Sequence, residues 1–321
     1  MIQKIWKSNN FLNFLLFPFS IFYYLIFVIY KLSNKEKRCN IPVLCVGNIT
    51  LGGAGKTPTV IEMRQILKNK FKKIFVLTRG YKGTAKGPLM VSKDHSFHEV
   101  GDESLLHSQF GLTCVSKKKF LGAKFCEAQG GNLIIMDDGL QSIDIKKDCK
   151  VLVIDGDYGF GNKNIFPSGP LREPISSGIK NCDLILIIGN NSNIFEDNNI
   201  IPKQKVFIAK KEISIESCKN KNLFVFSALG NNTNFHNSLL NSGFTIKRIK
   251  SFSDHYIFKK NDILSILNVA KKENLAVVCT KKDYIKVPEE FKNKIKPVNL
   301  NLKIEKKKKF EKRVLECLRA N

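Results

Sequence analysis

Acidic side chains are scarce in this sequence of 321 residues. It has 28 Asp and Glu against 53 Lys and Arg, which gives a formal net charge of +25. Such a charge favours binding to polyanions, which include anionic membranes and nucleic acids. Lysines spread over exposed faces also explain a large part of it. No RNP-type aromatic motif or zinc-binding module accompanies the charge, so we expect no nucleic-acid partner.

Cysteine pairs with metal-ligand spacing are also absent. The nine cysteines, an odd number, include no CxxC motif. This usage indicates reduced, mostly buried thiols of a cytosolic compartment rather than disulfides or a zinc site. The length suits two domains, or one large α/β domain with an appendage, and either can bury a full core.

Charge is missing altogether from residues 8–30, a run of 23 mostly apolar and aromatic residues. At about 1.5 Å per residue, a helix of this length crosses a hydrocarbon core of about 30 Å. A spanning helix and a helix lying in the interface both remain open, and a buried core helix is the less favoured alternative. Residues that interrupt the run are Asn13, Pro18 and Ser20.

No small-residue cleavage site follows this run, which argues against a signal peptide. Basic residues come next instead: Lys31, Lys35, Lys37 and Arg38. Basic residues after a membrane segment favour the cytoplasmic side for the chain that follows. We therefore expect the body of the protein at a cytoplasmic membrane surface.

Residues 43–60, VLCVGNITLGGAGKTPTV, have the layout of a phosphate-binding loop. Backbone N–H groups of such a loop surround the β- and γ-phosphates, Lys56 adds a positive charge and the Thr57 hydroxyl reaches Mg²⁺. The full GxxxxGK[ST] motif has glycine where this chain has Thr50. The residues expected to contact the nucleotide are Thr50, Leu51, Gly52, Gly53, Ala54, Gly55, Lys56 and Thr57.

Short apolar runs alternate with longer mixed segments along the rest of the chain. The runs expected to form strands are 43–46, 74–78, 133–136, 151–154, 184–188, 206–209, 223–226 and 276–279. Several lack inward/outward alternation, as strands covered by helices on both faces do. The pattern predicts an α/β fold of the P-loop NTPase type, with a doubly wound, mostly parallel sheet.

An Asn-rich stretch at residues 189–205 marks a boundary or long linker. We expect three parts: a membrane-associated helix with its basic flank (1–38), the P-loop core (39–190), and the remainder of the core with a smaller second α/β lobe (191–321).

A second chemical signal is LIIMDDGLQ, residues 133–141. An apolar strand that ends in Asp137 and Asp138 resembles the acidic strand end that holds Mg²⁺ opposite a phosphate loop. The alternative is an Asp-Gly turn after a strand. With the loop also present, we expect Thr57, Asp137 and Asp138 to hold the metal.

Further motifs narrow the class. They are TRGYKG (78–83), VGDE (100–103), DGDYGFGN and FPSGPLREP (155–174), SDHY (253–256) and TKKD (280–283). In order and spacing, the whole set resembles the tetraacyldisaccharide 4′-kinases, the lipid A 4′-kinases of Gram-negative bacteria. The resemblance covers nearly the whole chain, and GPLREP and DDGLQ are its most specific parts.

The resemblance implies an ATP- and Mg²⁺-dependent kinase of lipid A biosynthesis at the cytoplasmic face of the inner membrane. Its acceptor would be the 4′-hydroxyl of a tetraacylated glucosamine disaccharide 1-phosphate. Asp102 and His255 match the pair that activates this hydroxyl, a task that requires a positioned carboxylate. Residues expected near the substrate are Arg79, Tyr81, Glu103, Gln141 and Arg172. We expect a monomer.

One other class shares the loop and the membrane proximity: a membrane-associated P-loop GTPase or ATPase of the protein-targeting type. It gives no account of Asp102 with His255. The chain also departs from the family pattern, with Ser142 in place of a common histidine, lysines at 117–119 and Lys281 in place of a glutamate. None of these changes removes the loop, the acidic pair or the Asp102/His255 pair, so we expect an active enzyme.

Overall fold

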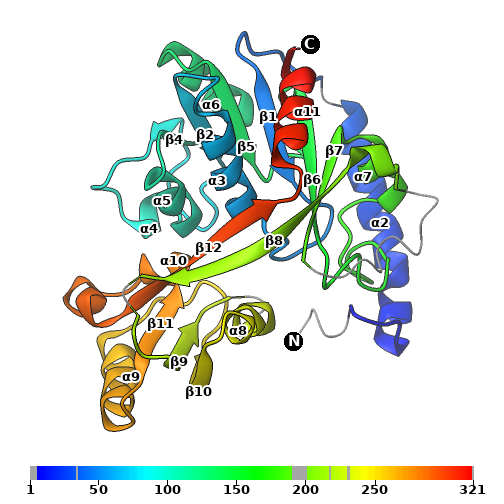
Figure 1. Ribbon diagram of the computed structural model, residues 1–321. Helices are drawn as coiled ribbons and strands as arrows, with labels where there is room; N and C mark the ends of the chain where they lie inside the picture. Colours follow the sequence, from blue (N-terminus) through cyan, green and yellow to red (C-terminus); the bar gives the residue numbers. More distant parts are fainter. Residues whose placement is uncertain (1–5, 34, 190–200, 217, 230–231, 320–321) are drawn as a thin grey trace.

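The computed structural model describes residues 6–33, 35–189, 201–216, 218–229 and 232–319. In this part of the chain, one twelve-stranded sheet runs through the molecule in the order β10-β9-β11-β12-β8-β7-β6-β1-β5-β2-β4-β3 (Figure 1). Neighbouring strands are parallel except for the β12/β8 and β3/β4 pairs. The strands are β1 (Val43–Gly47), β2 (Ile74–Thr78), β3 (Leu89–Met90), β4 (Thr113–Val115), β5 (Leu133–Asp137), β6 (Cys149–Asp155), β7 (Leu184–Ile188), β8 (Val206–Ile215), β9 (Asn222–Ser227), β10 (Thr245–Ser251), β11 (Ala276–Thr280) and β12 (Lys296–Ile304).

All eight predicted runs are strands, and the predicted α/β fold with a mostly parallel sheet is confirmed. The strands β3, β4, β10 and β12 were not predicted. β3 and β4 have only two and three residues. β10 and β12 carry polar residues on most exposed positions, so neither contains a continuous apolar run.

Helices cover both faces of the larger part of the sheet. α3 (Lys56–Leu67) and α11 (Lys307–Arg319) pack on one face, with Val60 and Phe310 in the same apolar core as strand residues such as Val46. α6 (Lys119–Ala128) and α7 (Ile175–Lys180) pack on the other. Strands buried on both faces have no polar side, which explains why their sequences do not alternate.

A smaller lobe repeats this layering. α9 (Lys260–Lys272) and α8 (Asn232–Asn241) pack on opposite faces of β9 and β11. The long antiparallel pair β8/β12 joins the two lobes, because β8 also pairs with β7 of the core (Figure 1). The boundary predicted near residue 190 lies outside the described residues, so the three-part division stays a prediction.

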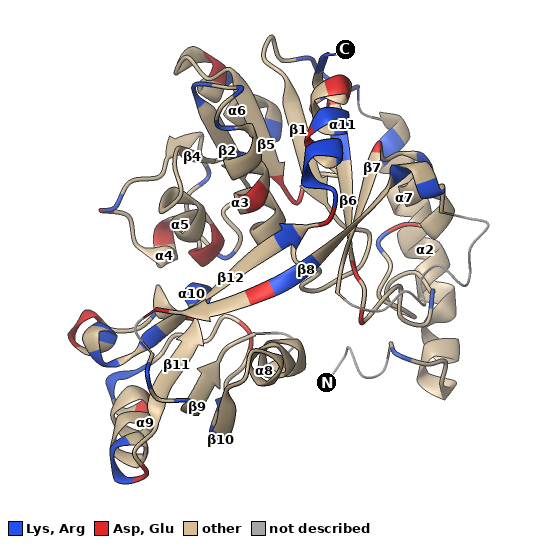
Figure 2. Cartoon of the chain, in the orientation of Figure 1, with Lys and Arg blue, Asp and Glu red and all other residues tan. Residues whose placement is uncertain are grey.

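The remaining helices are short, apart from α2. They are α4 (Phe97–Val100), α5 (Asp102–Ser108), α10 (Lys281–Tyr284) and two 3-10 turns, Lys203–Lys205 and Glu289–Lys294. Lys and Arg residues are spread over both lobes, on α11, β8 and α9 among others (Figure 2).

α2 (Phe11–Ser33) lies against the side of the core, beside α7 (Figure 1). Among the described residues it is the one helix that is long and apolar enough to cross a membrane. Most of its large apolar side chains are exposed, for example Phe11 and Phe14, so the core-helix alternative is wrong. The side chains that it buries are polar, Asn13 and Ser20.

Polar contacts attach α2 to the loop that precedes α7. The Ser20 hydroxyl donates to the carbonyl of Ile165 at 2.8 Å and accepts from the backbone N–H of Ser168 at 3.0 Å. The Ser168 hydroxyl donates to the carbonyl of Asn13 at 2.7 Å. Two of the residues that interrupt the apolar run, Asn13 and Ser20, thus lie on the docking stripe of the helix, whereas Pro18 is exposed, and the other sides of the helix are largely apolar.

Candidate functional site

The glycine-rich loop connects β1 to α3 at the carboxyl edge of the parallel strands, where ligands bind in open α/β sheets. Gly52 and Gly55 have φ values of 115° and 88°, a region that favours glycine. Thr50 has no such φ, because its backbone forms an isolated antiparallel bridge with Leu171. Because pairing with Leu171 holds the backbone of Thr50 in an ordinary conformation, the loop does not need the glycine that the full motif has at this position.

Leu171 belongs to the GPLREP motif. The N–H of Leu51 donates to the carbonyl of Pro170, and the N–H of Arg172 donates to the carbonyl of Ile49, both at 2.7 Å. The motif therefore supports the loop from its side and fixes the position of the Arg172 side chain beside it.

Lys56 opens α3 and reaches back over the loop. Its ammonium donates to Asn48 Oδ1 at 3.1 Å and lies 3.7 Å from Asp138 Oδ2. The amide of Asn48 donates to the carbonyl of Thr50 at 2.7 Å, so Asn48 links Lys56 to the loop backbone. Burial raises the pKa of Asp138, but Lys56 and Arg172 outweigh this effect and hold that pKa below its ordinary value.

Asp137 ends β5 next to the first turn of α3. Its Oδ2 lies 3.4 Å from the Thr57 hydroxyl and 2.7 Å from Nε2 of the buried His107. Its Oδ1 is buried without a hydrogen-bond partner. A buried carboxylate oxygen with an unused lone pair, beside a hydroxyl, fits a hard cation that prefers oxygen ligands.

Arg172 and Gln141 complete a polar cluster around Asp138. The Arg172 guanidinium donates both Nη groups to the Asp138 carboxylate, at 3.0 and 3.1 Å, and one also to Gln141 Oε1 at 3.2 Å. Gln141 Nε2 donates to the carbonyl of Asn48 and to Glu173 Oε1. Glu173 in turn lies 3.6 Å from Lys31 at the end of α2, so the cluster extends to the apolar helix.

Asp102 and His255 meet, although they are 153 positions apart in the chain. His255 Nδ1 lies 2.8 Å from Asp102 Oδ2; the Asp102 side chain is buried and that of His255 is 9% exposed. Asp102 opens α5, where Gly101, with φ of 82°, forms the N-cap. Burial raises the pKa of Asp102, but the His255 hydrogen bond and the nearby Lys282 and Lys286 lower it below its ordinary value.

Of the other predicted substrate residues, three lie near this pair and two lie elsewhere. The Tyr81 ring packs edge-on against the His255 ring at 5.4 Å and is exposed over 59% of its surface. Glu103 follows Asp102 and pairs with Lys282 at 3.0 Å. Arg79 lies exposed in the same loop as Tyr81. Gln141 and Arg172 lie instead in the cluster around Asp138.

α5 connects the Asp102/His255 pair with the Asp137/Thr57 pair. It carries Asp102 at its first position and His107 near its end, five residues later. At about 1.5 Å rise per residue these side chains start about 7.5 Å apart along the helix axis. A single short helix therefore sets the spacing between the Asp102/His255 pair and the Asp137/Thr57 pair.

Sequence reasoning missed four polar residues of the site: Asn48, His107, Glu173 and Lys282. Asn48 and Glu173 lie inside motifs whose signal comes from other residues. His107 lies five positions after Asp102 on the same helix. Nothing in the sequence distinguishes a buried histidine of this kind from an exposed one. Lys282 lies inside TKKD, a motif that by itself assigns it no role.

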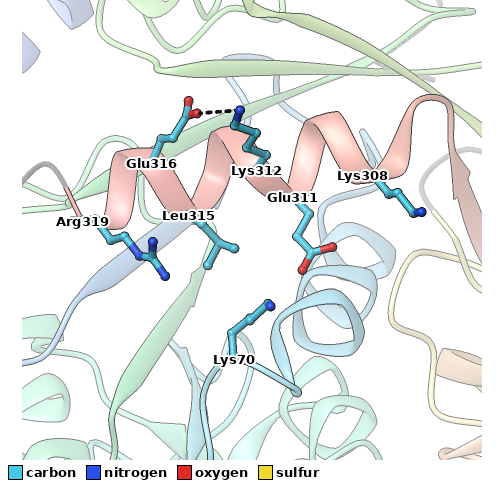
Figure 3. Close-up of a pocket in the computed structure, with 7 residues that line it drawn as sticks. All are labelled: Lys70, Lys308, Glu311, Lys312, Leu315, Glu316 and Arg319. Carbon is cyan, nitrogen blue, oxygen red and sulfur yellow. Dashed lines mark ion pairs between the residues drawn. The ribbon is translucent and has the colours of Figure 1, made fainter.

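A groove of about 390 Å³ lies elsewhere, between α11 and the end of α3 (Figure 3). Its lining residues are Lys70, Lys308, Glu311, Lys312, Leu315, Glu316 and Arg319. α3 has 12 residues, so its two ends are about 18 Å apart. The groove is therefore separated from the glycine-rich loop by the length of α3.

The parallel sheet, the glycine-rich loop closed by Lys56 and Thr57, and the aspartates at the end of β5 define a P-loop nucleotide-binding protein. The chain belongs to the tetraacyldisaccharide-1-P 4′-kinase family, whose pattern matches residues 12–319. The resemblance inferred from the motifs is thereby confirmed.

Individual relatives agree. A tetraacyldisaccharide 4′-kinase of Nitrobacter winogradskyi is 34% identical over 259 residues, which cover 79% of this chain and 77% of the relative. One of Bartonella henselae is 34% identical over 286 residues, 88% of this chain and 84% of the relative. The crystal structure of LpxK from Aquifex aeolicus in complex with ATP superposes with a TM-score of 0.78 at 26% identity, over 96% of this chain and 99% of that one.

Proposed function

We propose that this chain transfers the γ-phosphate of ATP to the 4′-hydroxyl of a tetraacylated glucosamine disaccharide 1-phosphate in lipid A biosynthesis. The observation that carries the proposal is the Asp102/His255 pair, because α5 places Asp102 at a fixed spacing from His107, which contacts Asp137 beside the glycine-rich loop. A P-loop protein that only hydrolyses a nucleotide has no need of a second, buried carboxylate–imidazole pair. A kinase with a hydroxyl acceptor does.

The loop residues 50–57 would bind the triphosphate of ATP. Their N–H groups and the first turn of α3 supply donors for phosphate oxygens, and Lys56 adds a charge at the β- and γ-phosphates. Phosphoryl transfer depends mainly on positioning and charge neutralisation, so an ordered loop supplies much of the catalysis.

Thr57, Asp137 and Asp138 would hold Mg²⁺. No group of three or more acidic, histidine or cysteine ligands occurs among the described residues, which agrees with a cation held by one or two carboxylates together with phosphate oxygens. The unpartnered Asp137 Oδ1 supports this assignment. When bound, the ion neutralises charge on the β- and γ-phosphate oxygens.

Asp102 would take the proton of the acceptor hydroxyl, with His255 orienting its carboxylate. The lowered pKa of Asp102 keeps it ionised and ready to accept a proton at neutral pH. Tyr81, Arg79 and Glu103 would contact the sugar or its phosphate beside this pair. Arg172 would act near the transferred phosphate, since a guanidinium binds phosphate oxygens bidentately.

The membrane-facing part of the proposal concerns α2. Its exposed apolar sides and the basic flank from Lys31 to Arg38 would bring the enzyme, as a monomer, to the cytoplasmic face of the inner membrane, where an acylated acceptor resides. Lys31 is paired with Glu173 of the polar cluster, so this contact would orient the site toward the lipid surface.

The test is transfer of labelled phosphate from ATP to a purified acylated disaccharide 1-phosphate by the full chain. ATP turnover should depend on this acceptor. Asp102→Asn should lower kcat by about 10²- to 10⁴-fold, the usual contribution of general acid–base catalysis, with KM for ATP within about twofold. Asp94→Asn, at an exposed loop position, is the matched control. Acceptor-independent turnover, or full turnover by Asp102→Asn, would refute the proposal.

A further inference from the structure

We infer that Lys282 is a positioning residue that holds His255 in one tautomer, with Nδ1–H directed at Asp102 and Nε2 bare. The inference rests on the proposed function, because it concerns the base of that reaction. Lys282, on α10 of the second lobe, would thus act on the pair formed by Asp102 on α5 and His255 in the loop before α9.

Three side chains of the site meet at the Lys282 ammonium. Its Nζ lies 3.0 Å from Glu103 Oε1, 3.5 Å from His255 Nε2 and 3.9 Å from Asp102 Oδ2. Lys282 lies on α10, directly after β11, whereas Asp102 and Glu103 lie on α5. One lysine thus contacts both carboxylates and the imidazole across the contact between α10 and α5.

The chemistry of the donors selects the tautomer. An ammonium group has three donors and no acceptor, so the ring nitrogen that faces it must offer a lone pair. Asp102 Oδ2, at 2.8 Å from Nδ1, is an ionised oxygen and must accept. Both contacts therefore specify the same neutral imidazole, which donates from Nδ1 to the base.

Lys282 also opposes a competing arrangement. Asp254 Oδ1 lies 3.8 Å from His255 Nε2, so carboxylates flank both ring nitrogens and a hydrogen on Nε2 would also have an acceptor nearby. Asp254 is half exposed, and its contact is longer than that of Asp102. The Lys282 ammonium opposes a hydrogen on Nε2, and a ring with hydrogens on both nitrogens would hold the charge of Asp102 on which proton abstraction depends.

The surroundings keep Lys282 charged and in place. Burial lowers the pKa of Lys282, but Glu103 and Asp102 more than compensate and raise it above its ordinary value. A second cation, Lys286, lies 4.0 Å from Asp102 Oδ2 and 3.0 Å from the buried Asp283. Asp283 also accepts from the backbone N–H of Ala228 and from the Thr280 hydroxyl, so it holds α10 to the second lobe.

Neither the backbone hydrogen bond of His255 nor its contact with Tyr81 involves a ring nitrogen. His255 has a φ of 62°, a left-handed conformation that is uncommon for residues with a side chain. Its N–H donates to the carbonyl of Ala228, and its ring contacts the exposed Tyr81 on one side. The loop itself therefore leaves the choice between the two ring nitrogens to the polar groups around them.

The experiment combines histidine ¹⁵N spectra with kinetics on the full chain in detergent. The chain has five histidines, and loss of signals in His255→Gln assigns the ring of interest. In the unmodified enzyme, His255 should show one protonated and one bare ring nitrogen at pH 7. In Lys282→Met the signals should move toward those of imidazolium, and Lys282→Arg, which keeps charge and donors, should restore the bare Nε2.

The kinetic readout is the pH profile of kcat. In Lys282→Met, an imidazolium that donates to Asp102 would hold the charge of the carboxylate and weaken it as a base, so the acid limb of the profile should move to higher pH, with kcat at pH 7 reduced about tenfold and KM for ATP unchanged within about twofold. The groups that face the pair, namely Glu103, Asp254, Lys286 and Tyr81, are unaltered in this variant. Lys260→Met removes an exposed lysine of the same lobe that also pairs with a glutamate, and should change neither readout.

An unchanged ¹⁵N signature together with an unchanged pH profile in Lys282→Met overturns the inference, whether or not kcat falls, because a merely structural loss moves neither. If Lys282→Met does not fold, as judged by its melting curve, the same two measurements on Lys282→Gln decide in the same way. Asp102→Asn separates the hypotheses: if it is inactive while Lys282→Met behaves as the unmodified enzyme, only the inference fails. If Asp102→Asn is fully active, the proposed function fails.

Discussion

His107 illustrates how one buried side chain connects parts of the site that the motifs treat separately. It lies on α5, the helix of Asp102, and its Nε2 contacts Asp137 Oδ2, which also lies next to the Thr57 hydroxyl. The contact uses one carboxylate oxygen and leaves Oδ1 of Asp137 unpartnered. His107 therefore fixes the orientation in which Asp137 presents its remaining oxygen, the arrangement expected of an outer-shell partner if Asp137 holds Mg²⁺ as proposed.

Replacing His107 by Leu should raise the Mg²⁺ concentration for half-maximal activity by about 10- to 100-fold, the usual effect of losing such a partner. Leucine fills the space of the imidazole without offering a hydrogen bond. The measurement is phosphate transfer over a range of Mg²⁺ concentrations, with His98→Gln at an exposed position as control. If Mg²⁺ dependence is unchanged, His107 has only a packing role.

At the scale of elements, α2 shows that a helix can be apolar on most sides and still have a defined docking face. The partly or fully buried positions recur along one narrow stripe from Asn13 through Ser20 to Lys31. Its anchors are hydrogen bonds to residues 165–168, a loop that continues directly into the GPLREP segment beside the nucleotide loop. The apolar helix is thus attached to the segment beside the glycine-rich loop through a few hydrogen bonds between serine side chains and the backbone.

Ser20→Ala should loosen this attachment without making α2 less apolar. The backbone N–H of Ser168 would lose its acceptor, and a hydrogen bond of this kind contributes about 0.5–1.5 kcal/mol, so exchange of that amide should accelerate about 2- to 13-fold. Hydrogen–deuterium exchange of a peptide that covers residues 160–172 measures the effect. Ile21→Ala, at an exposed neighbouring position, should leave exchange unchanged. Equal exchange in both variants would argue against docking through Ser20.

At the scale of the whole molecule, one continuous sheet places chemistry from distant parts of the chain at a shared site. The loop after β1 and the end of β5 supply the nucleotide side, and the loop before α9 with α10 supplies His255 and Lys282 from the second lobe. Because β8 and β12 connect the lobes, the position of the second lobe relative to Asp102 depends on this strand pair.

Deleting residues 1–30 should abolish sedimentation with anionic vesicles, because it removes nearly all of the exposed apolar helix. The basic residues from Lys31 to Arg38 remain, and their attraction is weak at physiological salt. ATP binding, measured in parallel, should persist, since the loop and β1 are intact. Undiminished sedimentation of the truncated protein would show that α2 is not the anchor.

Much of the fold followed from the sequence because its signals are local. Apolar runs predicted eight of the twelve described strands, and the glycines with Lys56 and Thr57 predicted the strand–loop–helix unit. β10 and β12 lack such runs, because polar residues occupy most of their exposed positions, so no local pattern predicted them. The sequence also could not show the contacts of Thr50 and Arg172. Thr50 bridges to Leu171 and Arg172 donates to Asp138, and each contact joins two separate segments of the chain.

The sequence by itself determined the family, the nucleotide loop, the acidic strand end and an apolar N-terminal segment, because each is written in contiguous residues. Only the tertiary structure decided that Asp102 and His255 meet, that His107 and Lys282 support their neighbours, and that Asn13 and Ser20 dock α2. These contacts depend on where strands of one sheet end and on which side chains become buried together. Burial turns an ordinary histidine or lysine into a positioned one, because most buried polar groups pair within the protein.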